Sequence, residues 1–434
     1  MRFQNGTLHV GNISLPDLVE EYGSPLYVYD AEVIRRQIDR VKSAFAPLPF
    51  RPFYAMKAND NLALLRMMLS EGFGCDCVSP GEVFLAKHAG FSGDRIWFTC
   101  SNVSDEDLIS LGDPSIVINV NSMNEIDRVI RLRLSNPIAI RVNPEIGAGH
   151  HRDVVTGGYG VKFGIDLAEI EEARLTAEAE DLRIVGLHAH IGSGVSEIEP
   201  LIASAGILMN LAGDFVDLKW INFGGGINVP YKPGDREFPI AEYGQALEEL
   251  AGERLRARGL TAILEPGRYL VAESGLLATR VTSFRISSGV EWLGCDTGFN
   301  HLARPAKYGA YHHIVNASRG SDSDLRQNAS VVAEGSHQAV IAGNLCESGD
   351  VFTRDADGPV TRPIAPTSVG DLLAICDAGA YGFSMASRYN ARRLPAEVLV
   401  DGSSARLVRE RERIEDFLRG QSEPLHSTSG GDRR

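Results

Sequence analysis

The stretch Phe53-Tyr-Ala-Met-Lys-Ala-Asn-Asp60, FYAMKAND, is apolar until a single lysine interrupts it. The apolar residues predict a buried strand, and an unpaired ammonium group inside a protein is energetically costly. Lys57 is either a lysine whose amine reaches solvent from the strand end or an amine that faces a functional cavity. The residues that end the neighbouring strands decide between these two interpretations.

Seven more apolar stretches follow, separated by amphipathic segments that are typical of helices. Together the eight predicted strands fall within residues 51–59, 74–82, 95–102, 115–122, 138–144, 184–194, 220–226 and 262–268. This alternation predicts an α/β fold with a parallel (β/α)8 barrel. Each strand becomes polar or glycine-rich at its carboxyl end, where barrel enzymes carry their active sites. Lys57 stands at that end of the first strand.

The C-terminal part of the chain lacks this alternation and contains short strands with turns, which predicts a second, mainly β domain. We expect the barrel to span residues 26–269 and the second domain to combine residues 1–25 with 270–415. The N-terminal segment is expected to pair with the second domain because it precedes the first barrel helix and includes the strand-like LYVYD. Residues 416–434 contain few apolar side chains and are expected to be disordered.

Composition excludes several classes of function. The chain has 434 residues, of which 44% are hydrophobic, and a net charge of −14, which disfavours binding to nucleic acid or to anionic membranes. No apolar run is long enough to cross a bilayer, and the N-terminus does not resemble a signal peptide. Six scattered cysteines indicate reduced thiols in a cytoplasmic protein. No cluster completes His188-x-His190 as a metal site, so no metal is expected.

Three further strand ends carry residues that suit an anionic cofactor. FGGGIN ends the seventh strand and can form a glycine nest for phosphate, EPGR brings Glu265 and Arg268, and HAHIGSG brings His190 and Ser193. Each motif alone has a plainer reading: a turn, a structural ion pair or a core histidine. Combined with the amine of Lys57, they favour pyridoxal 5′-phosphate, which needs an amine, a phosphate site and control of its ring nitrogen.

The sequence resembles the fold-type III pyridoxal-phosphate decarboxylases, and most closely the diaminopimelate decarboxylase branch. The resemblance extends from residue 22 to residue 402. It rests on the motifs YAMKAN, GCDCVSPGEV, RVNP, TGGYGVKFGI, GLHAHIGSG, FGGGINVPY, EPGRYLV, NHLARPAKYGAYHHI, GNLCESGDVF and DAGAYGFSMASRYN. It implies a TIM-like barrel of the alanine racemase type with a β-rich second domain.

The resemblance also implies the residues that bind the cofactor. Lys57 is expected to bond covalently to its aldehyde, and Glu265 to hold its ring nitrogen protonated. His190 is expected to stack on the ring, and Asp76 to support the site from the second strand. The phosphate is expected to bind Ser193, Gly225 and Gly226, with Arg268 and Tyr381 also in reach.

A second set is implied for the substrate. Arg268, Arg304 and Tyr308 are expected to hold the carboxylate distant from the reaction, and Tyr381 to reach both substrate and phosphate. Cys346, as proton donor, and Glu347 are expected to come from a second subunit. The resemblance therefore implies a homodimer with active sites at the subunit interface.

The implied reaction is decarboxylation of meso-2,6-diaminopimelate to L-lysine. Planar guanidinium groups suit a distal carboxylate, which lysine and ornithine lack, so Arg304 favours this substrate. A sister decarboxylase acting on carboxynorspermidine or on a siderophore or antibiotic precursor stays open, because Gly194, Lys307 and residues 149–158 depart from the family pattern near the expected substrate mouth.

Two functions of other classes also share this barrel. One is amino-acid racemisation, and the segment CESGD favours decarboxylation over it. The other is non-enzymatic carriage of pyridoxal phosphate, which needs only the barrel and is disfavoured by the large second domain.

Overall fold

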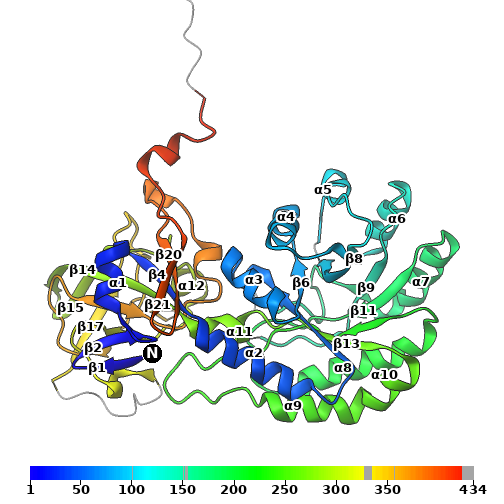
Figure 1. The fold of residues 1–434 in the computed structure, drawn as a ribbon, viewed down its shortest axis with the longest axis horizontal. Helices are drawn as coiled ribbons and strands as arrows, with labels where there is room; N and C mark the ends of the chain where they lie inside the picture. The colour runs from blue at the N-terminus through cyan, green and yellow to red at the C-terminus, as the bar shows by residue number, and fades with distance from the viewer. Residues whose placement is uncertain (100, 150, 152–154, 327–334, 356, 423–434) are drawn as a thin grey trace, which may run out of the picture.

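A computed structural model describes residues 1–99, 101–149, 151, 155–326, 335–355 and 357–422. The chain forms two lobes that lie side by side, a helix-covered barrel and a β-rich domain (Figure 1). The chain begins in the β-rich lobe, passes into the barrel, and returns to complete the first lobe (Figure 1).

The barrel contains the eight strands that the sequence predicted. All pair in parallel, in the order β9-β11-β12-β13-β5-β6-β7-β8, and pairing of β8 with β9 closes the ring. A short strand, β10 (Ile165–Asp166), extends β9. The eight strands are β5 (Phe50–Ala55), β6 (Gly74–Cys77), β7 (Ile96–Phe98), β8 (Val117–Val120), β9 (Ile138–Asn143), β11 (Ile184–His188), β12 (Trp220–Asn222) and β13 (Thr261–Leu264).

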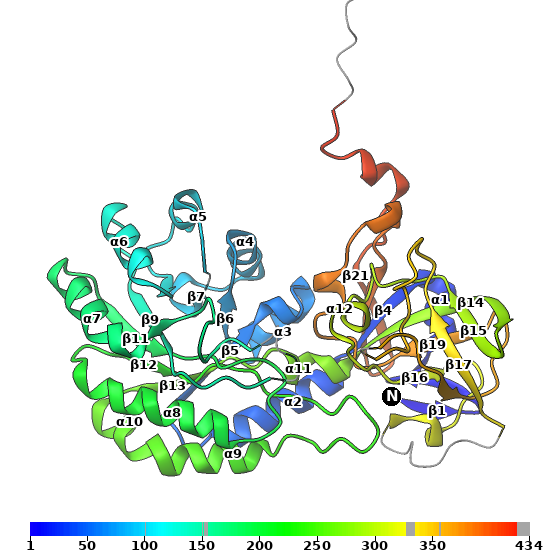
Figure 2. The same cartoon turned by 180° about the vertical axis from the view of Figure 1, so that it is seen from behind.

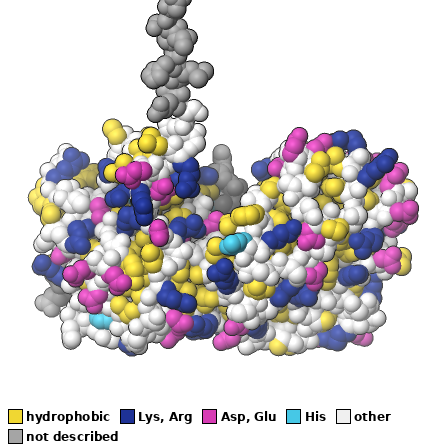
Figure 3. Space-filling view, turned by 45° about the horizontal axis from the view of Figure 1, so that its top comes forward, with side chains coloured by type: hydrophobic (Ala, Val, Ile, Leu, Met, Phe, Trp, Pro, Cys, Tyr) yellow, Lys and Arg dark blue, Asp and Glu magenta, His cyan; other side chains and the backbone are white. Residues whose placement is uncertain are grey.

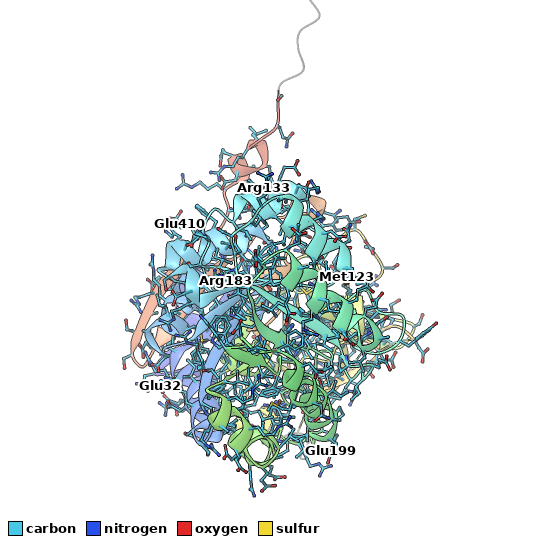
Figure 4. All side chains as sticks on the ribbon, turned by 90° about the vertical axis from the view of Figure 1, so that its right-hand side faces the viewer. Glu32, Met123, Arg133, Arg183, Glu199 and Glu410 are labelled. Atoms are coloured by element: carbon cyan, nitrogen blue, oxygen red, sulfur yellow. The ribbon has the colours of Figure 1, made fainter. Side chains whose placement is uncertain are left out.

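Helices surround these strands, and Figure 4 shows them from the barrel side, with Met123 and Glu199 labelled at the starts of α6 and α8. Local sequence signals set several boundaries: Asp30 caps the start of α2 by accepting from the backbone of Glu32, and α4 ends at Gly90 in the left-handed region. The helices are α2 (Ala31–Phe45), α3 (Leu62–Ser70), α4 (Pro80–Ala89), α5 (Asp105–Ser110), α6 (Met123–Arg131), α7 (Ile170–Ala179), α8 (Glu199–Leu211), α9 (Ile240–Leu247), α10 (Glu253–Arg258) and α11 (Arg268–Val271).

The inside of the barrel changes from apolar to polar along each strand. An apolar cluster that contains Val117, Ala139 and Ile263 is buried within it. Side chains two residues further along a strand point to the same face, and at these positions the same strands carry Asn119, Arg141 and, just past β13, Glu265. All three polar side chains are buried. The barrel is therefore packed at one end and lined with polar groups towards the carboxyl ends of its strands.

The second domain is built on a mixed sheet in the order β18-β17-β15-β14-β4-β20-β21, with β19 and β16 pairing from β14. A small sheet of β1 (Arg2–Gln4), β2 (Thr7–Val10) and β3 (Ile13–Ser14), followed by α1 (Leu15–Tyr22), precedes it in the chain. The larger sheet contains β4 (Leu26–Asp30), β14 (Gly275–Ser287), β15 (Val290–Cys295), β16 (Ile314–Asn316), β17 (His337–Ala342), β18 (Arg362–Ile364), β19 (Leu372–Ile375), β20 (Ala396–Asp401) and β21 (Ser404–Arg409), and α12 (Arg304–Tyr308) lies between β15 and β16.

One expected boundary moves. The strand β4 is hydrogen-bonded between β14 and β20, so residues 26–30 belong to the second sheet, not to the barrel domain that was expected to begin at residue 26. All five side chains of β4 are buried. The apolar character of LYVYD therefore indicates an interior strand but does not indicate which of the two domains contains it.

Two segments connect or extend the lobes. The segment 223–239 reaches from the barrel towards the second domain (Figure 2). A 3-10 helix, η12 (Ile414–Leu418), includes the first residues of the predicted tail, and residues 423–434 lie outside the described part of the chain. Within the described residues, the helices are too short or too polar to span a bilayer.

Candidate active site

A cavity of about 500 Å³ lies at the carboxyl ends of the barrel strands, and the second domain contributes part of its wall. In the space-filling view, the two lobes are separated by a recess at the upper edge of the molecule (Figure 3). The cavity is lined by Lys57, Val78, Thr99, Ser101, Arg141, Thr156, Lys162, Phe163, His190, Ser193, Arg268, Arg304, Tyr308, Tyr381 and Met385.

Positive charge dominates this lining. Five of the lining side chains are lysines or arginines: Lys57, Arg141, Lys162, Arg268 and Arg304. None of the described lining residues is an aspartate or glutamate. Such a surface attracts ligands that carry several negative charges, such as a phosphate together with carboxylates.

Lys57 lies in a 3-10 turn, η1 (Met56–Ala58), directly after β5. Its Nζ is 3.4 Å from Oδ2 of the fully buried Asp76. Burial by itself lowers the pKa of Lys57, but the negative charges of Asp76 and Glu265 and the nearby Tyr381 raise it above its ordinary value. Within the described part of the chain, Asp76 Oδ1 has no hydrogen-bond partner, so the carboxylate keeps an acceptor beside the amine.

Glu265 follows β13 and is held in a buried polar network. Its Oε1 accepts a hydrogen bond from Asn222 Nδ2 at 2.5 Å, and its Oε2 lies 3.3 Å from Nε2 of His188. Burial alone would raise the pKa of Glu265, but His188 and Lys57 outweigh it and lower the pKa to about 2. Glu265 is therefore a buried carboxylate that stays ionised across the physiological pH range.

His190 is a neutral ring on the cavity wall. Burial, together with the positive charges of Lys57 and Arg141, lowers its pKa well below the ordinary value. The Gly225 N–H donates to His190 Nδ1 at 3.2 Å, which assigns Nδ1 as an acceptor and leaves the other ring nitrogen protonated. A flat, neutral ring of this kind suits stacking against a heteroaromatic cofactor.

The glycines after β12 allow a very close approach of three strand ends. A Cβ atom at Gly224, Gly225 or Gly226 would lie 2.2 to 2.3 Å from a backbone carbonyl oxygen of a neighbouring loop. Larger residues would push these loops apart. The predicted phosphate site is therefore compact, but the N–H of Gly225 is directed to the His190 ring.

Two buried arginines, Arg268 and Arg304, line another part of the cavity. Arg268 donates to Ser193 Oγ and to Tyr231 Oη, both at 2.8 Å, and its guanidinium lies 4.8 Å from the Tyr381 ring centroid. Arg304 lies 4.5 Å from the Tyr231 ring centroid. Among the described residues, neither guanidinium forms an ion pair with a carboxylate, although both side chains are at least 95% buried; Arg268 is 5% and Arg304 2% exposed.

The remaining predicted residues divide into two groups. Tyr308 lies on the cavity wall with its ring 5.6 Å from that of His151. Cys346 and Glu347 are exposed on the second domain and do not line the cavity. Cys346 is nonetheless ordered, because its N–H donates to Asn390 Oδ1 at 2.8 Å.

The loop that carries Cys346 and Glu347 is fixed by hydrogen bonds to the buried side chain of Asp350. Asp350 accepts backbone hydrogen bonds from Phe299 at 2.7 Å and from Leu345 at 2.8 Å. These bonds fix the conformation of the CESGD segment on the surface of the second domain. The segment does not line the cavity of its own chain.

Several cavity residues were not singled out from the sequence. Arg141 interrupts the apolar strand IAIRVNP as Lys57 interrupts FYAMKAND, so the same signal was available for it. Its guanidinium lies 4.6 Å from the Phe163 ring centroid. Lys162, Thr99 and Thr156 carry no comparable signal, because charged and hydroxyl residues are common in loops.

Comparison with known proteins agrees with this geometry. Residues 31–272 match the pyridoxal binding domain of the pyridoxal-dependent decarboxylases. Over 430 residues the chain is 42% identical to the diaminopimelate decarboxylase of Methanothermobacter thermautotrophicus, with 96% of each chain covered. The chain belongs to the diaminopimelate decarboxylase family. It is also 39% identical to the diaminopimelate decarboxylase of Streptomyces coelicolor, covering 93% of this chain and 90% of that one.

Solved members of the diaminopimelate decarboxylase family share the whole fold. The enzyme from M. jannaschi superposes with a TM-score of 0.86 at 32% identity, covering 98% of both chains. A second diaminopimelate decarboxylase superposes with a TM-score of 0.84 at 36% identity, covering 96% of this chain and 98% of that one. This chain is thus a pyridoxal-phosphate-dependent decarboxylase, as its sequence predicted.

The residues present fit this cofactor. Lys57 supplies an amine, Glu265 an ionised carboxylate, His190 a neutral ring, and the cationic wall with its tight glycine turn suits a phosphate. Two buried polar atoms, Arg268 Nε and Asp76 Oδ1, have no hydrogen-bond partner among the described residues. Among the residues that the structure describes, no group of three or more His, Cys, Asp or Glu side chains could hold a metal ion.

Proposed function

We propose that this chain decarboxylates meso-2,6-diaminopimelate to L-lysine and carbon dioxide as a homodimer. The observation that carries the proposal is that one cavity holds Lys57 together with two buried arginines, Arg268 and Arg304, that have no carboxylate partner among the described residues. Burying an uncompensated guanidinium is unfavourable unless a ligand supplies the opposite charge. The distal carboxylate of diaminopimelate supplies it, and the names of the relatives agree with this substrate.

The residues around Lys57 prepare the cofactor end. Asp76 Oδ2, 3.4 Å from the Lys57 Nζ, is the nearest acceptor for the proton that the ammonium loses when the amine bonds to the cofactor aldehyde. Burial and the charge of Glu265 raise the pKa of Asp76, which makes it a better proton acceptor. Bound pyridoxal phosphate supplies an electron sink for the carbon that loses carbon dioxide. The anionic Glu265 favours a protonated ring nitrogen and so strengthens that sink.

At the substrate end, Arg304 and Arg268 bind the carboxylate that is retained in the product. Tyr308 and Tyr381 line the same cavity and limit the orientations open to a flexible dicarboxylate. Holding one end of the substrate in this way places the other α-carboxylate at the reacting centre. Lysine and ornithine have only the α-carboxylate that would be lost in the reaction. As substrates they would leave the two guanidinium groups without an anion, so they are disfavoured.

Proton return to the α-carbon is assigned to Cys346 of the partner subunit. Its own chain exposes it on an ordered loop outside the cavity, which supports use by a second copy. A thiol suits the task because its reference pKa of about 8.5 is near neutrality. Glu347 is expected to enter the same neighbouring site and contribute to substrate binding.

A substrate panel tests the reaction. The purified holoenzyme is incubated with meso-diaminopimelate, carboxynorspermidine, lysine and ornithine, and carbon dioxide and amine products are measured. We expect lysine from diaminopimelate, and rates at least about a hundredfold lower on the others. Release of carbon dioxide chiefly from carboxynorspermidine would move the chain to the sister decarboxylases.

Mixed dimers test the shared site. Lys57→Ala and Cys346→Ala are each expected to be inactive alone. If each active site takes Lys57 from one subunit and Cys346 from the other, unfolding and refolding an equal mixture should recover about a quarter of wild-type activity. That fraction arises because half of the dimers are mixed and each has one intact site. No recovery in verified mixed dimers would show that both residues act from the same chain.

A further inference from the structure

The ring of His312 contacts Arg304 and is not part of the cavity lining. It is fully buried, shortly after α12, between the two lobes. Tyr231, from the segment 223–239 that reaches out of the barrel, packs edge-on against it with ring centroids 5.5 Å apart. His312 therefore stands where the barrel and the second domain meet around the cavity.

Both ring nitrogens of His312 have partners, and these partners set its protonation state. Nδ1 is 2.8 Å from the carbonyl oxygen of Cys376, which can only accept, so Nδ1 carries the proton and donates. Nε2 is 2.8 Å from Nη1 of Arg304, which can only donate, so Nε2 accepts. Burial and the neighbouring Arg304 lower the pKa of His312 well below the ordinary value, in agreement with a neutral ring.

A neutral acceptor can orient the guanidinium of Arg304 without neutralising its charge, whereas a carboxylate cannot. Elsewhere in this chain the partly buried Arg326 pairs with a carboxylate, 2.6 Å from Glu273. A carboxylate beside Arg304 would orient the guanidinium but would also cancel its charge and compete with an incoming anion. A neutral imidazole fixes one edge of the guanidinium and leaves its full positive charge for a ligand.

We infer that His312 is a positioning residue that sets the orientation of Arg304 for the distal carboxylate of the substrate, and so contributes to substrate specificity without touching the substrate. The inference rests on the proposed function, because it takes the anion at Arg304 to be that carboxylate. The local chain path supports this inference. Arg304 is the first residue of α12, and the left-handed turn at Gly309 brings His312, eight positions later, back against its guanidinium.

Two nearly isosteric variants separate the two hydrogen bonds. The amide oxygen of His312→Gln can occupy the place of Nε2 and accept from Arg304, whereas the amide nitrogen of His312→Asn can occupy the place of Nδ1 and donate only to Cys376 O. Both replace the same buried ring, so a merely structural role predicts equal damage. A role through Arg304 predicts that glutamine rescues function and asparagine does not.

The measurement uses the holoenzyme and two ligands. Bound as the product, lysine has its single carboxylate at the distal position, and cadaverine is the same chain without that carboxylate. The dissociation constants of both are determined by calorimetry, with cofactor absorbance and melting temperature as checks. We expect His312→Asn to weaken lysine binding by about ten- to a hundredfold and to raise KM for diaminopimelate similarly. His312→Gln should stay within about threefold of wild type, and cadaverine binding should change in neither variant.

A double variant guards against misfolding as an explanation. On an Arg304→Ala background, His312→Asn should weaken lysine binding by less than about twofold more, since the group through which it acts is gone. If His312→Asn fails to fold, unchanged lysine binding in His312→Gln alone would support the inference, and a tenfold loss in that variant would overturn it. Equal losses in both single variants, or additive losses in the double variant, would also overturn it. Wild-type enzyme that binds no lysine would instead refute the proposed function.

Discussion

The two ends of the cavity handle buried charge in opposite ways. Around Lys57, the charges compensate one another: the amine faces Asp76, and Glu265 accepts from Asn222 beside His188. Around Arg304, the described structure offers only neutral partners, the ring of His312 and the face of Tyr231. The cofactor end is therefore electrostatically satisfied by the protein itself, whereas the substrate end keeps a surplus of positive charge.

This difference in charge compensation suits the two ends of the cavity to different tasks, the chemical step and substrate binding. A compensated network holds the amine of Lys57 and the carboxylate of Glu265 in place at little cost in stability. A surplus of buried positive charge lowers stability but gives affinity to any anion of the right shape. We expect substitutions at the first end to damage the chemical step and substitutions at the second to damage substrate binding.

The largest expected effect is at Lys57. Lys57→Ala should lower kcat by at least about a thousandfold, because no other amine among the described residues lies beside Asp76 to bond the cofactor aldehyde. Borohydride trapping followed by peptide mass spectrometry should find the cofactor adduct on Lys57 in wild type and no adduct in the variant. The control is Lys162→Ala, which removes the other lysine of the cavity wall and should leave the adduct intact. An adduct on Lys162 in wild type would contradict the assignment.

Glu265→Gln is expected to lower kcat by about a hundredfold, because a neutral amide cannot hold the ring nitrogen protonated. Since the pKa of Glu265 is about 2, its protonation should not contribute to the acid limb of the wild-type pH–rate profile above about pH 5. Glu265→Asp keeps the charge and should recover part of kcat. A glutamine variant with normal kcat would show that the carboxylate does not act on the cofactor.

Arg304→Ala should raise KM for diaminopimelate by about ten- to a hundredfold, with the cofactor spectrum unchanged, because only the distal carboxylate loses its partner. Lys307→Ala removes an exposed charge from the same short helix and serves as the matched control, with KM within about twofold of wild type. Loss of the cofactor in Arg304→Ala would place this arginine at the wrong end of the cavity.

The smallest effects should appear in the free energy of unfolding, and only the substitution at the Lys57 end should lower it clearly. In cofactor-free protein, Glu265→Gln should lower the free energy of unfolding at neutral pH by about 1–3 kcal/mol, because the folded carboxylate is favoured by its partners. Since the folded pKa is lowered from 4.5, this stabilisation is complete above pH 4.5 and is lost as the pH falls towards 2, so the two proteins should converge there. Urea unfolding at several pH values measures the difference.

The counterpart at the other end is Arg304→Leu. Replacing an uncompensated buried charge by an apolar side chain should leave the free energy of unfolding within about 1 kcal/mol of wild type, or raise it. A loss as large as that of Glu265→Gln would show that groups other than His312 and Tyr231 compensate the charge at the substrate end.

Much of the fold could be predicted because it follows from local pattern. Each apolar strand is followed directly in the chain by its polar end. These polar ends converge when the parallel strands close into a barrel. Lys57 and Glu265 were found in this way, and Arg141 could have been. The N-terminal segment with LYVYD was expected to pair with the second domain, as β4 does, but the barrel was expected to begin at residue 26. A fully buried strand has no polar side to show where the second sheet ends and the barrel begins.

The substrate end was less accessible to such reasoning. Tyr231 and His312 come from separate loops and meet only when the lobes dock, so no spacing along the chain relates them. The position of Cys346 outside the cavity of its own chain likewise depends on how the second domain folds. Motif resemblance named Cys346 and Arg304, but it did not indicate what holds the guanidinium in place.

The sequence by itself determined the barrel, its chemically active rim and the choice of cofactor, because these depend on side-chain periodicity and on which residue ends each strand. Only the tertiary structure decided which charges are neutralised and which remain available. That outcome depends on distances between residues far apart in the chain and on the low dielectric around them, which set the protonation of Glu265, His190 and His312.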